Sequence, residues 1–229
     1  GFSFRADSGR VDIATDRFYP VDISRNYKYR GYLKSAGSAG DSAVYFGLKA
    51  YDKDFLEVFA FHTNFDISTK TYLTQQLNPG DTIVHINDAT NWKNNDQSAF
   101  YRKFAIYPYN NYDEYTYTRL VYQYDSVDYI NKTITLSQAY NGIAKPVGTK
   151  VSNNAGSEQP MYVPLSGSQV SPAWSLKETT LQKTQIPSTS SHSVFRYGTK
   201  YVKPFLWMNF SQTGNYTSFI DDIELYIIE

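Results

Sequence analysis

Two stretches decide the fold of this chain: Thr199-Lys-Tyr-Val-Lys-Pro-Phe-Leu-Trp-Met-Asn-Phe210 and Phe219-Ile-Asp-Asp-Ile-Glu-Leu-Tyr-Ile-Ile-Glu229. Both alternate with the period of two that is typical of β-strands. Between them, Gln212-Thr-Gly-Asn215 has the composition of a turn. We therefore predict two β-strands around a turn at the end of the sequence.

The alternation gives each strand two unlike faces. In the first strand, one face is expected to hold Val202, Leu206, Met208 and Phe210. The opposite, non-core face is expected to hold Tyr201, Phe205, Trp207 and Asn209. In the second strand, the apolar face is expected to hold Phe219, Ile223, Leu225 and Ile227, together with Asp221. A carboxylate among apolar side chains has to be paired, hydrogen-bonded or bound to a metal.

Earlier in the chain, the same periodicity predicts strands over 27–35, 42–51 and 55–61. The first of these should turn Tyr27, Tyr29, Gly31 and Leu33 to one face and Lys28, Arg30, Tyr32 and Lys34 to the other. The second should turn inward Val44, Phe46, Leu48 and Ala50 and turn outward Tyr45, Gly47, Lys49 and Tyr51.

The middle of the chain, about 69–151, has a pattern of its own. Pro79-Gly80 and Asn141-Gly142 mark turns, and short strands recur at roughly ten-residue spacing, which is typical of a small barrel. It also contains a tyrosine cluster, which consists of Tyr107, Tyr109, Tyr112, Tyr115 and Tyr117.

These motifs resemble two kinds of known domain. Phe219-Ile-Asp-Asp-Ile223, together with Pro20-Val-Asp-x-Ser24 and Tyr45-Phe-Gly-Leu48, is similar to strands of jelly-roll carbohydrate-binding modules. Leu77-Asn-Pro-Gly-Asp-Thr82 and the rest of the middle resemble small β-barrel units of bacteriophage tail proteins. The resemblance implies an all-β chain: a discontinuous jelly-roll β-sandwich, 1–68 plus 152–229, with an inserted small β-barrel, 69–151.

The jelly-roll resemblance also implies a structural calcium ion that joins the N-terminal segment to the last strand. Calcium takes six to eight oxygen ligands from carboxylates and carbonyls. Asp221 matches the family's carboxylate, with Asp7 the nearest acidic partner and Asp12 the next. The alternative is that Asp221 accepts hydrogen bonds from backbone amides at a strand end.

The anomaly of the composition is its aromatic content, with 22 Tyr, 14 Phe and 3 Trp. Flat apolar rings bind sugars by stacking, with a few polar groups to fix orientation. The candidate ligand-binding residues on the non-core faces are Trp207, Tyr201, Phe205, Asn209, Tyr32, Arg30, Tyr45 and Tyr51. Alternatively, this face packs against the insertion or against a neighbouring subunit.

Several function classes have little support. Lys plus Arg and Asp plus Glu both total 22, so the charge gives no case for nucleic acid. No apolar run is long enough for a membrane helix, so no membrane insertion is expected. There is no cysteine, and the three histidines have no metal-ligand spacing. Asp52/Asp54 and Asp221/Asp222 are the nearest approach to paired catalytic acids, but turns favour solvated acids, so an enzyme is not expected.

We therefore expect a non-catalytic, extracellular or virion module of a phage tail fibre or related tail protein. It would bind bacterial surface glycans or present a binder for them. One alternative is a structural spacer that trimerises within a fibre. Another is an accessory carbohydrate-binding module of a polysaccharide-degrading enzyme.

Overall fold

The computed structural model describes residues 3–7, 9–36, 44–107, 118–163, 170–185, 191–210 and 217–228. Within these ranges the chain is all-β, with antiparallel sheets and only single-turn 3-10 helices. The expected fold class is therefore confirmed at this level. None of the helices in the described part of the chain is long and apolar enough to cross a membrane.

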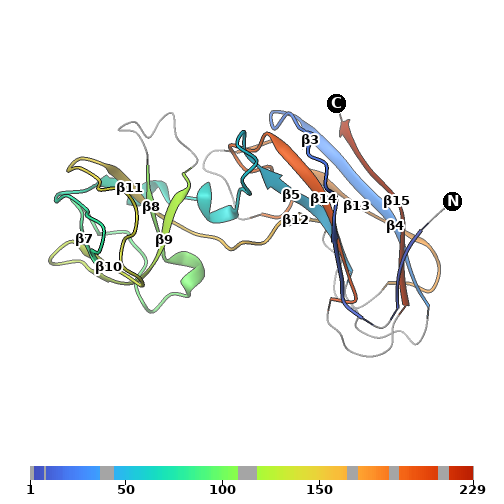
Figure 1. Ribbon diagram of the computed structural model, residues 1–229, viewed down its shortest axis with the longest axis horizontal. Helices are drawn as coiled ribbons and strands as arrows, with labels where there is room; N and C mark the ends of the chain where they lie inside the picture. Colours follow the sequence, from blue (N-terminus) through green and yellow to red (C-terminus); the bar gives the residue numbers. More distant parts are fainter. Residues whose placement is uncertain are drawn as a thin grey trace.

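The first sheet joins the two ends of the chain. Its order is β1 (Phe4–Asp7), β15 (Thr217–Ile228), β4 (Asn26–Ala36) and β13 (Ser175–Leu181), and every pairing is antiparallel. The last strand thus lies between two strands from the N-terminal segment (Figure 1). We call this sheet A.

The second sheet contains the aromatic strand of the sequence. Its order is β12 (Met161–Tyr162), β5 (Tyr45–Tyr51), β14 (Tyr201–Met208) and β2 (Val11–Ala14), and the short β3 (Tyr19–Pro20) also pairs with β14. The expected strands over 199–210 and 42–51 correspond to β14 and β5. We call this sheet B.

Sheets A and B pack face to face as a β-sandwich around one hydrophobic core (Figure 1). Period-two alternation supplies the core from both sides, because strand side chains point alternately to opposite faces. Its fully buried members include Tyr29, Leu33, Phe46, Leu48, Val202, Met208 and Ile220.

The third sheet is built from the middle of the chain. Its order is β6 (Thr71–Tyr72), β11 (Lys150–Asn154), β8 (Lys103–Ile106), β9 (Leu120–Asp128), β10 (Thr133–Leu136) and β7 (Ile83–His85). Its two edges meet, since Leu73 bridges Ile86 and the Thr74 amide donates to the His85 carbonyl at 3.0 Å. The residues of this segment form a separate hydrophobic core, which contains Trp92. Figure 1 shows this sheet beside the sandwich.

The strand expected over 55–61 does not form. The Asp52 carboxylate accepts hydrogen bonds from the Asp54 and Leu56 amides, and Phe55 has a φ of 59°. These contacts turn the chain, so that only one bridge, Tyr51 to Glu57, precedes the 3-10 helix η1 (Ala60–His62).

The predicted faces of the last strand are wrong for Phe219 and Asp221. A β-bulge lies between Asp221 and Glu224, where Asp222 has a φ of 48°. Before the bulge the buried side chains are Ser218 and Ile220, and after it the inward ones are Ile223 and Leu225. A bulge adds one residue and so exchanges the faces of the strand. Phe219 and Asp221 therefore lie on the outer face.

Candidate ligand-binding face

The outer face of sheet B is formed by cross-strand pairs of β14 and β5. Residues directly opposite in an antiparallel pair turn their side chains to the same face. Along the two strands the outward pairs are Tyr201 with Tyr51, Lys203 with Lys49, Phe205 with Gly47, and Trp207 with Tyr45. The three aromatic residues predicted for one face, Tyr45, Tyr201 and Trp207, all lie on this outer face.

One end of this face carries the tryptophan cluster, which we define as Tyr45, Tyr162, Trp207 and Phe210. The Trp207 and Phe210 rings are stacked, with centroids 5.4 Å apart, and Tyr45 meets both rings edge-on. The Arg10 guanidinium lies over the Phe210 ring at 4.4 Å. These rings form a half-buried aromatic surface with a cation at its rim.

The prediction that Phe210 belongs to the core face is wrong. Asn209 has a φ of 52°, a left-handed conformation that breaks the alternation of β14. Phe210 therefore turns to the side of Trp207 and enlarges the outer cluster.

Asn209 itself is not available to a ligand, because it is buried between the sheets. Its side-chain amide donates to the carbonyls of Gly9 and Ala6, and its side-chain oxygen accepts from the Ser218 hydroxyl at 2.9 Å. The predicted ligand residue is thus a structural link between β14 and the first and last strands.

Phe205 is also buried, although it lies on the predicted face. Its ring fills the space above Gly47, where an added Cβ would stand 2.7 Å from the ring and closer still to the Met161 carbonyl. Phe205 lies 4.7 Å from the Trp207 ring and supports it from below the exposed surface.

The other end of the face carries the phenylalanine cluster, which we define as Phe18, Tyr51, Phe55 and Tyr201. Phe55 and Tyr201 are stacked at 4.8 Å, and Phe18 packs against both rings and against Tyr51. Half of the Phe55 surface is exposed, in a left-handed conformation that is unfavourable for a bulky residue. Strained, exposed residues of this kind concentrate at binding sites.

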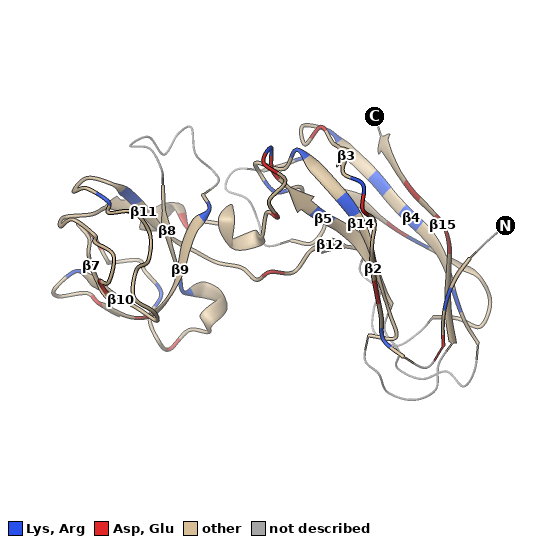
Figure 2. Ribbon diagram, viewed as in Figure 1, with Lys and Arg blue, Asp and Glu red and all other residues tan. Residues whose placement is uncertain are grey.

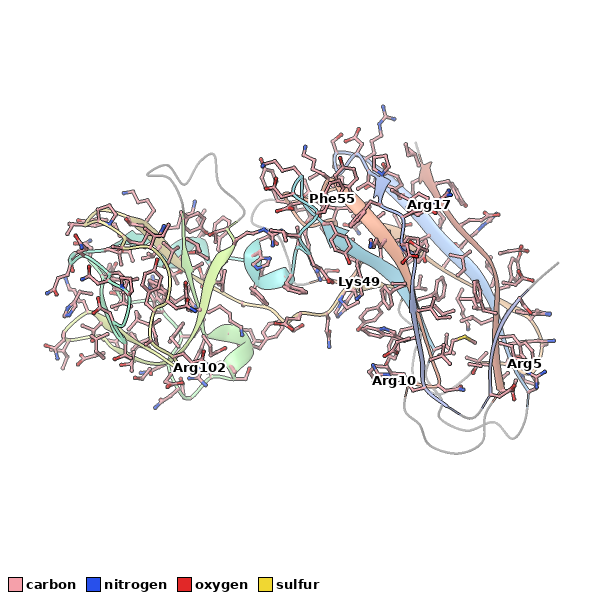
Figure 3. All side chains as sticks on the ribbon, viewed as in Figure 1. Arg5, Arg10, Arg17, Lys49, Phe55 and Arg102 are labelled. Atoms are coloured by element: carbon pink, nitrogen blue, oxygen red, sulfur yellow. The ribbon has the colours of Figure 1, made fainter. Side chains whose placement is uncertain are left out.

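Two lysines separate the clusters. Lys49 and Lys203 are directly opposite each other, and the Lys203 ammonium lies 4.1 Å from the centre of the Phe18 ring. Figure 3 places Lys49 and Arg10 on the side of the sandwich that is turned toward the six-stranded sheet, with Phe55 at its end. The sequence analysis did not identify Phe18, Phe55 or the lysine pair as site residues. The turn before Phe55 was the one signal that its side chain would be exposed.

Arg30 and Tyr32 do not belong to this face. Both are on β4, and they point outward from sheet A, on the other side of the sandwich from Trp207. Arg30 donates to Glu224 at 2.8 Å and lies over the Tyr226 ring. Figure 2 shows basic residues on both β4 and β14, in different sheets. Sequence periodicity assigns a residue to a face but not to a sheet.

The predicted calcium ligands are not neighbours. Asp7 pairs with Thr217, four residues before Asp221 on β15, which is a separation of about 13 Å along the strand. Asp7 accepts hydrogen bonds from Thr217 and Arg5, which lower its pKa, and Asp221 accepts from the Asp222 amide. No group of three or more potential metal-binding side chains occurs in the described ranges. These two carboxylates do not fit one calcium site.

The structural calcium ion itself, joining the N-terminal segment to the last strand, stays a prediction. A bound ion stabilises only the folded state, so chelation should lower the melting temperature. An unchanged melting temperature after chelation would contradict it.

The tyrosine cluster of the middle segment is represented by Tyr107 alone, since Tyr109, Tyr112, Tyr115 and Tyr117 lie outside the described residues. Tyr107 is buried, and its hydroxyl is 3.0 Å from that of Ser152. Burial raises the pKa of Tyr107 to about 12.

Two histidines are involved in packing contacts. His62 Nδ1 accepts from the Phe59 amide, and burial, reinforced by the charge of Arg119, lowers its pKa to about 3. His192 stacks on Tyr162 at 4.1 Å, and burial lowers its pKa as well. Both rings are stabilised in the neutral form, and His192 extends the aromatic surface of the tryptophan cluster.

A groove of about 590 Å³ lies apart from these clusters, at the open edge between β3 of sheet B and the end of β15. Its lining is mostly apolar and includes Tyr19, Pro20, Val202, Tyr226 and Ile227. No local sequence pattern indicates this groove, because its walls come from opposite sheets.

Comparison with known proteins adds no relative. No protein-family model matches the chain, and neither the curated proteins nor the solved structures contain a significant match.

Proposed function

We propose that this chain is a non-catalytic module of a phage tail fibre or related tail protein that binds bacterial surface glycans. In this proposal the sandwich is a jelly roll, and the middle segment is a small β-barrel inserted into it. The bridge between Leu73 and Ile86, which connects the edges of the six-stranded sheet, supports the barrel. The resemblance of that segment to phage tail units supports the tail-fibre context and a location on the virion.

The observation that carries the glycan proposal is the arrangement of two aromatic clusters along one sheet face. Trp207 lies six positions after Tyr201 on β14, which is about 20 Å of strand. An extended oligosaccharide can therefore stack on both clusters at once. Sugar rings present apolar C–H faces to aromatic rings, while their hydroxyls remain free for polar neighbours.

The test is a pair of substitutions, Trp207→Ala and Phe55→Ala, one in each cluster. Loss of a ring contact of about 0.5–1.5 kcal/mol should weaken binding up to about tenfold. Trp174→Ala is the matched control, since Trp174 is 42% exposed on the outer face of sheet A. Affinity would be titrated with short soluble oligosaccharides found by glycan array, so that avidity does not contribute.

Variants of both clusters that bind every glycan as the unchanged protein does would contradict the proposal. Melting curves verify folding, because Trp207 also contacts the buried Phe205. The Phe55→Ala variant tests binding independently of folding, because half of the Phe55 surface is exposed.

A second candidate function, subunit packing in a fibre, is favoured by the outer face of sheet A. Four of its large side chains are each about 40% exposed: Trp174, Leu176, Tyr32 and Tyr226. Apolar surfaces of this kind often mark subunit contacts. A homotrimer in solution that Leu176→Asp dissociates would support this role, and a monomer at high concentration would oppose it.

A further inference from the structure

We propose that the glycan bound by sheet B is acidic, and that its carboxylate or phosphate groups lie between Lys49 and Lys203. This inference rests on the proposed function and names the chemical class of its ligand. It starts from the position of the two lysines, which form one cross-strand rung in the middle of the aromatic face.

Two like charges directly opposite each other destabilise a sheet. Two basic side chains of sheet A pair with acids, Lys28 with Glu178 and Arg30 with Glu224. Within the part of the chain that the structure describes, neither Lys49 nor Lys203 has a carboxylate within ion-pair distance. The rung thus carries two positive charges without an ion-pair partner among the described residues.

The neighbouring acids do not neutralise the rung. Glu57 interacts electrostatically with Lys49 at longer range, and burial, which is the larger influence, raises the pKa of Glu57. Asp12, which is opposite Trp207, is paired with Arg10 at 3.0 Å. Asp12 is thus paired outside the rung, and Glu57 acts on Lys49 only from beyond ion-pair distance, so the space between the lysines remains suited to an anion.

The rung is also positioned by aromatic rings. The Lys203 ammonium lies 4.1 Å from the Phe18 ring centre and 5.7 Å from that of Tyr51. These cation–π contacts orient the ammonium beside the phenylalanine cluster without consuming its hydrogen-bond donors. An ammonium group donates strong charge-assisted hydrogen bonds to carboxylate and phosphate oxygens.

A ligand that stacks on both aromatic clusters must also contact the Lys49 and Lys203 ammonium groups. Along β14, Lys203 lies two residues, about 7 Å, from Tyr201 and four residues, about 13 Å, from Trp207. A saccharide that stacks on Trp207 and Phe55 therefore crosses the two ammonium groups. The net charge of the whole chain is zero, so the attraction is local to this rung.

The experiment compares three soluble probes of equal length: a uronic-acid oligosaccharide, a phosphorylated oligosaccharide and a neutral oligosaccharide. We expect at least one acidic probe to bind ten times more tightly than the neutral probe, with an affinity that falls as salt rises. The acidic probe that binds better identifies the source of the anion.

The variants are Lys49→Gln, Lys203→Gln and the double variant. Each should weaken the acidic probe about tenfold and leave the neutral probe unchanged, whereas Phe55→Ala should weaken both. Lys34→Gln is the matched control, because Lys34 also lies over two aromatic rings, Trp174 and Phe219, but on sheet A.

The outcomes separate the two proposals. Neutral and acidic probes that bind equally, or lysine variants that bind the acidic probe normally, overturn the inference while the glycan function stands. If Phe55→Ala and Trp207→Ala leave binding unchanged, the glycan function of this face is overturned. It is also overturned if the unchanged protein binds none of the probes. Either result overturns the inference as well.

Discussion

Gly47 decides how the aromatic residues of β14 are arranged around it. The absence of a side chain lets the β12 backbone and the Phe205 ring approach β5 closely. Phe205 is buried as a result, and Trp207 packs against it while it also stacks on Phe210. A residue without chemistry of its own thus sets the depth of the candidate binding surface.

Gly47→Ala should therefore destabilise the sandwich and disturb the tryptophan cluster. The new methyl group would stand 2.5 Å from the Tyr162 Cα and 2.7 Å from the Phe205 ring. Overpacking of this kind costs about 1–3 kcal/mol of unfolding free energy. Chemical denaturation followed by tryptophan fluorescence measures it. Gly9→Ala is the control, since its nearest non-neighbour atom is 3.8 Å away; equal stability of the two variants would contradict the prediction.

At the scale of elements, β15 shows how one inserted residue changes the chemistry of a strand. Asp222 and Ile223 together oppose the single residue Gly31 of β4. The bulge returns Ile223 and Leu225 to the core and leaves the Asp221 carboxylate outside, where it needs no buried partner. The bulge therefore removes the physical reason for expecting a metal at this carboxylate.

Substitutions of Asp222 test the bulge. A left-handed φ costs an ordinary L-residue about 1–2 kcal/mol and costs a β-branched residue more, whereas glycine adopts it freely. Aspartate already occupies this conformation and tolerates it better than most L-residues, so Asp222→Val should lower the unfolding free energy by up to about 1–2 kcal/mol, and Asp222→Gly should leave it nearly unchanged. A valine variant as stable as the glycine variant would show that the strand can pair without the bulge.

The 3-10 helix η1 makes stability depend on pH through His62. Its pKa is about 3 in the folded chain, against 6.5 for an unperturbed histidine. The unfolded chain therefore takes up this proton first, so the stabilisation is complete above pH 6.5 and is lost as the pH falls from 6.5 toward 3.

The loss should reach at most about 1.4 kcal/mol per pH unit from this group. Denaturation curves between pH 7.5 and pH 4.5 measure it. His62→Gln, which keeps an acceptor for the Phe59 amide, should flatten the dependence on pH. Parallel curves for the two proteins would assign the dependence to other groups.

At the scale of the whole molecule, an ion pair connects the sandwich to the six-stranded sheet. Asp52 follows β5, and Arg119 precedes β9. The Arg119 guanidinium donates to the Asp52 carboxylate at 2.5 and 2.9 Å and to the carbonyls of Leu56 and Glu57. Asp52 is only 5% exposed, so removal of Arg119 leaves a poorly solvated carboxylate.

A double-mutant cycle with Asp52→Asn and Arg119→Met should give a coupling energy of about 0.5–3 kcal/mol. The comparison is the more exposed pair Lys28–Glu178, for which about 0.2–1 kcal/mol is expected. Equal coupling in the two cycles would mean that the connection contributes no more than a surface ion pair. Small-angle scattering of the single variants would report whether the two parts then change their relative position.

The sequence by itself determined the all-β class and the positions of β4, β5 and β14. Period-two alternation is a local consequence of strand geometry, and residues such as Tyr29, Phe46 and Val202 carry it without regard to distant segments. The exposed sides of Tyr45, Tyr201 and Trp207 follow from the same rule.

Only the tertiary structure decided which residues share a surface. Tyr32 and Tyr45 have the same pattern in sequence, yet they belong to opposite sheets, because strand pairing is fixed by long-range register rather than by local periodicity. The left-handed residues Asn209 and Asp222 exchange the faces of the residues that follow them. The charged rung of Lys49 and Lys203 likewise exists only because β5 pairs with β14 across more than 150 residues of chain. No local sequence pattern could therefore predict it.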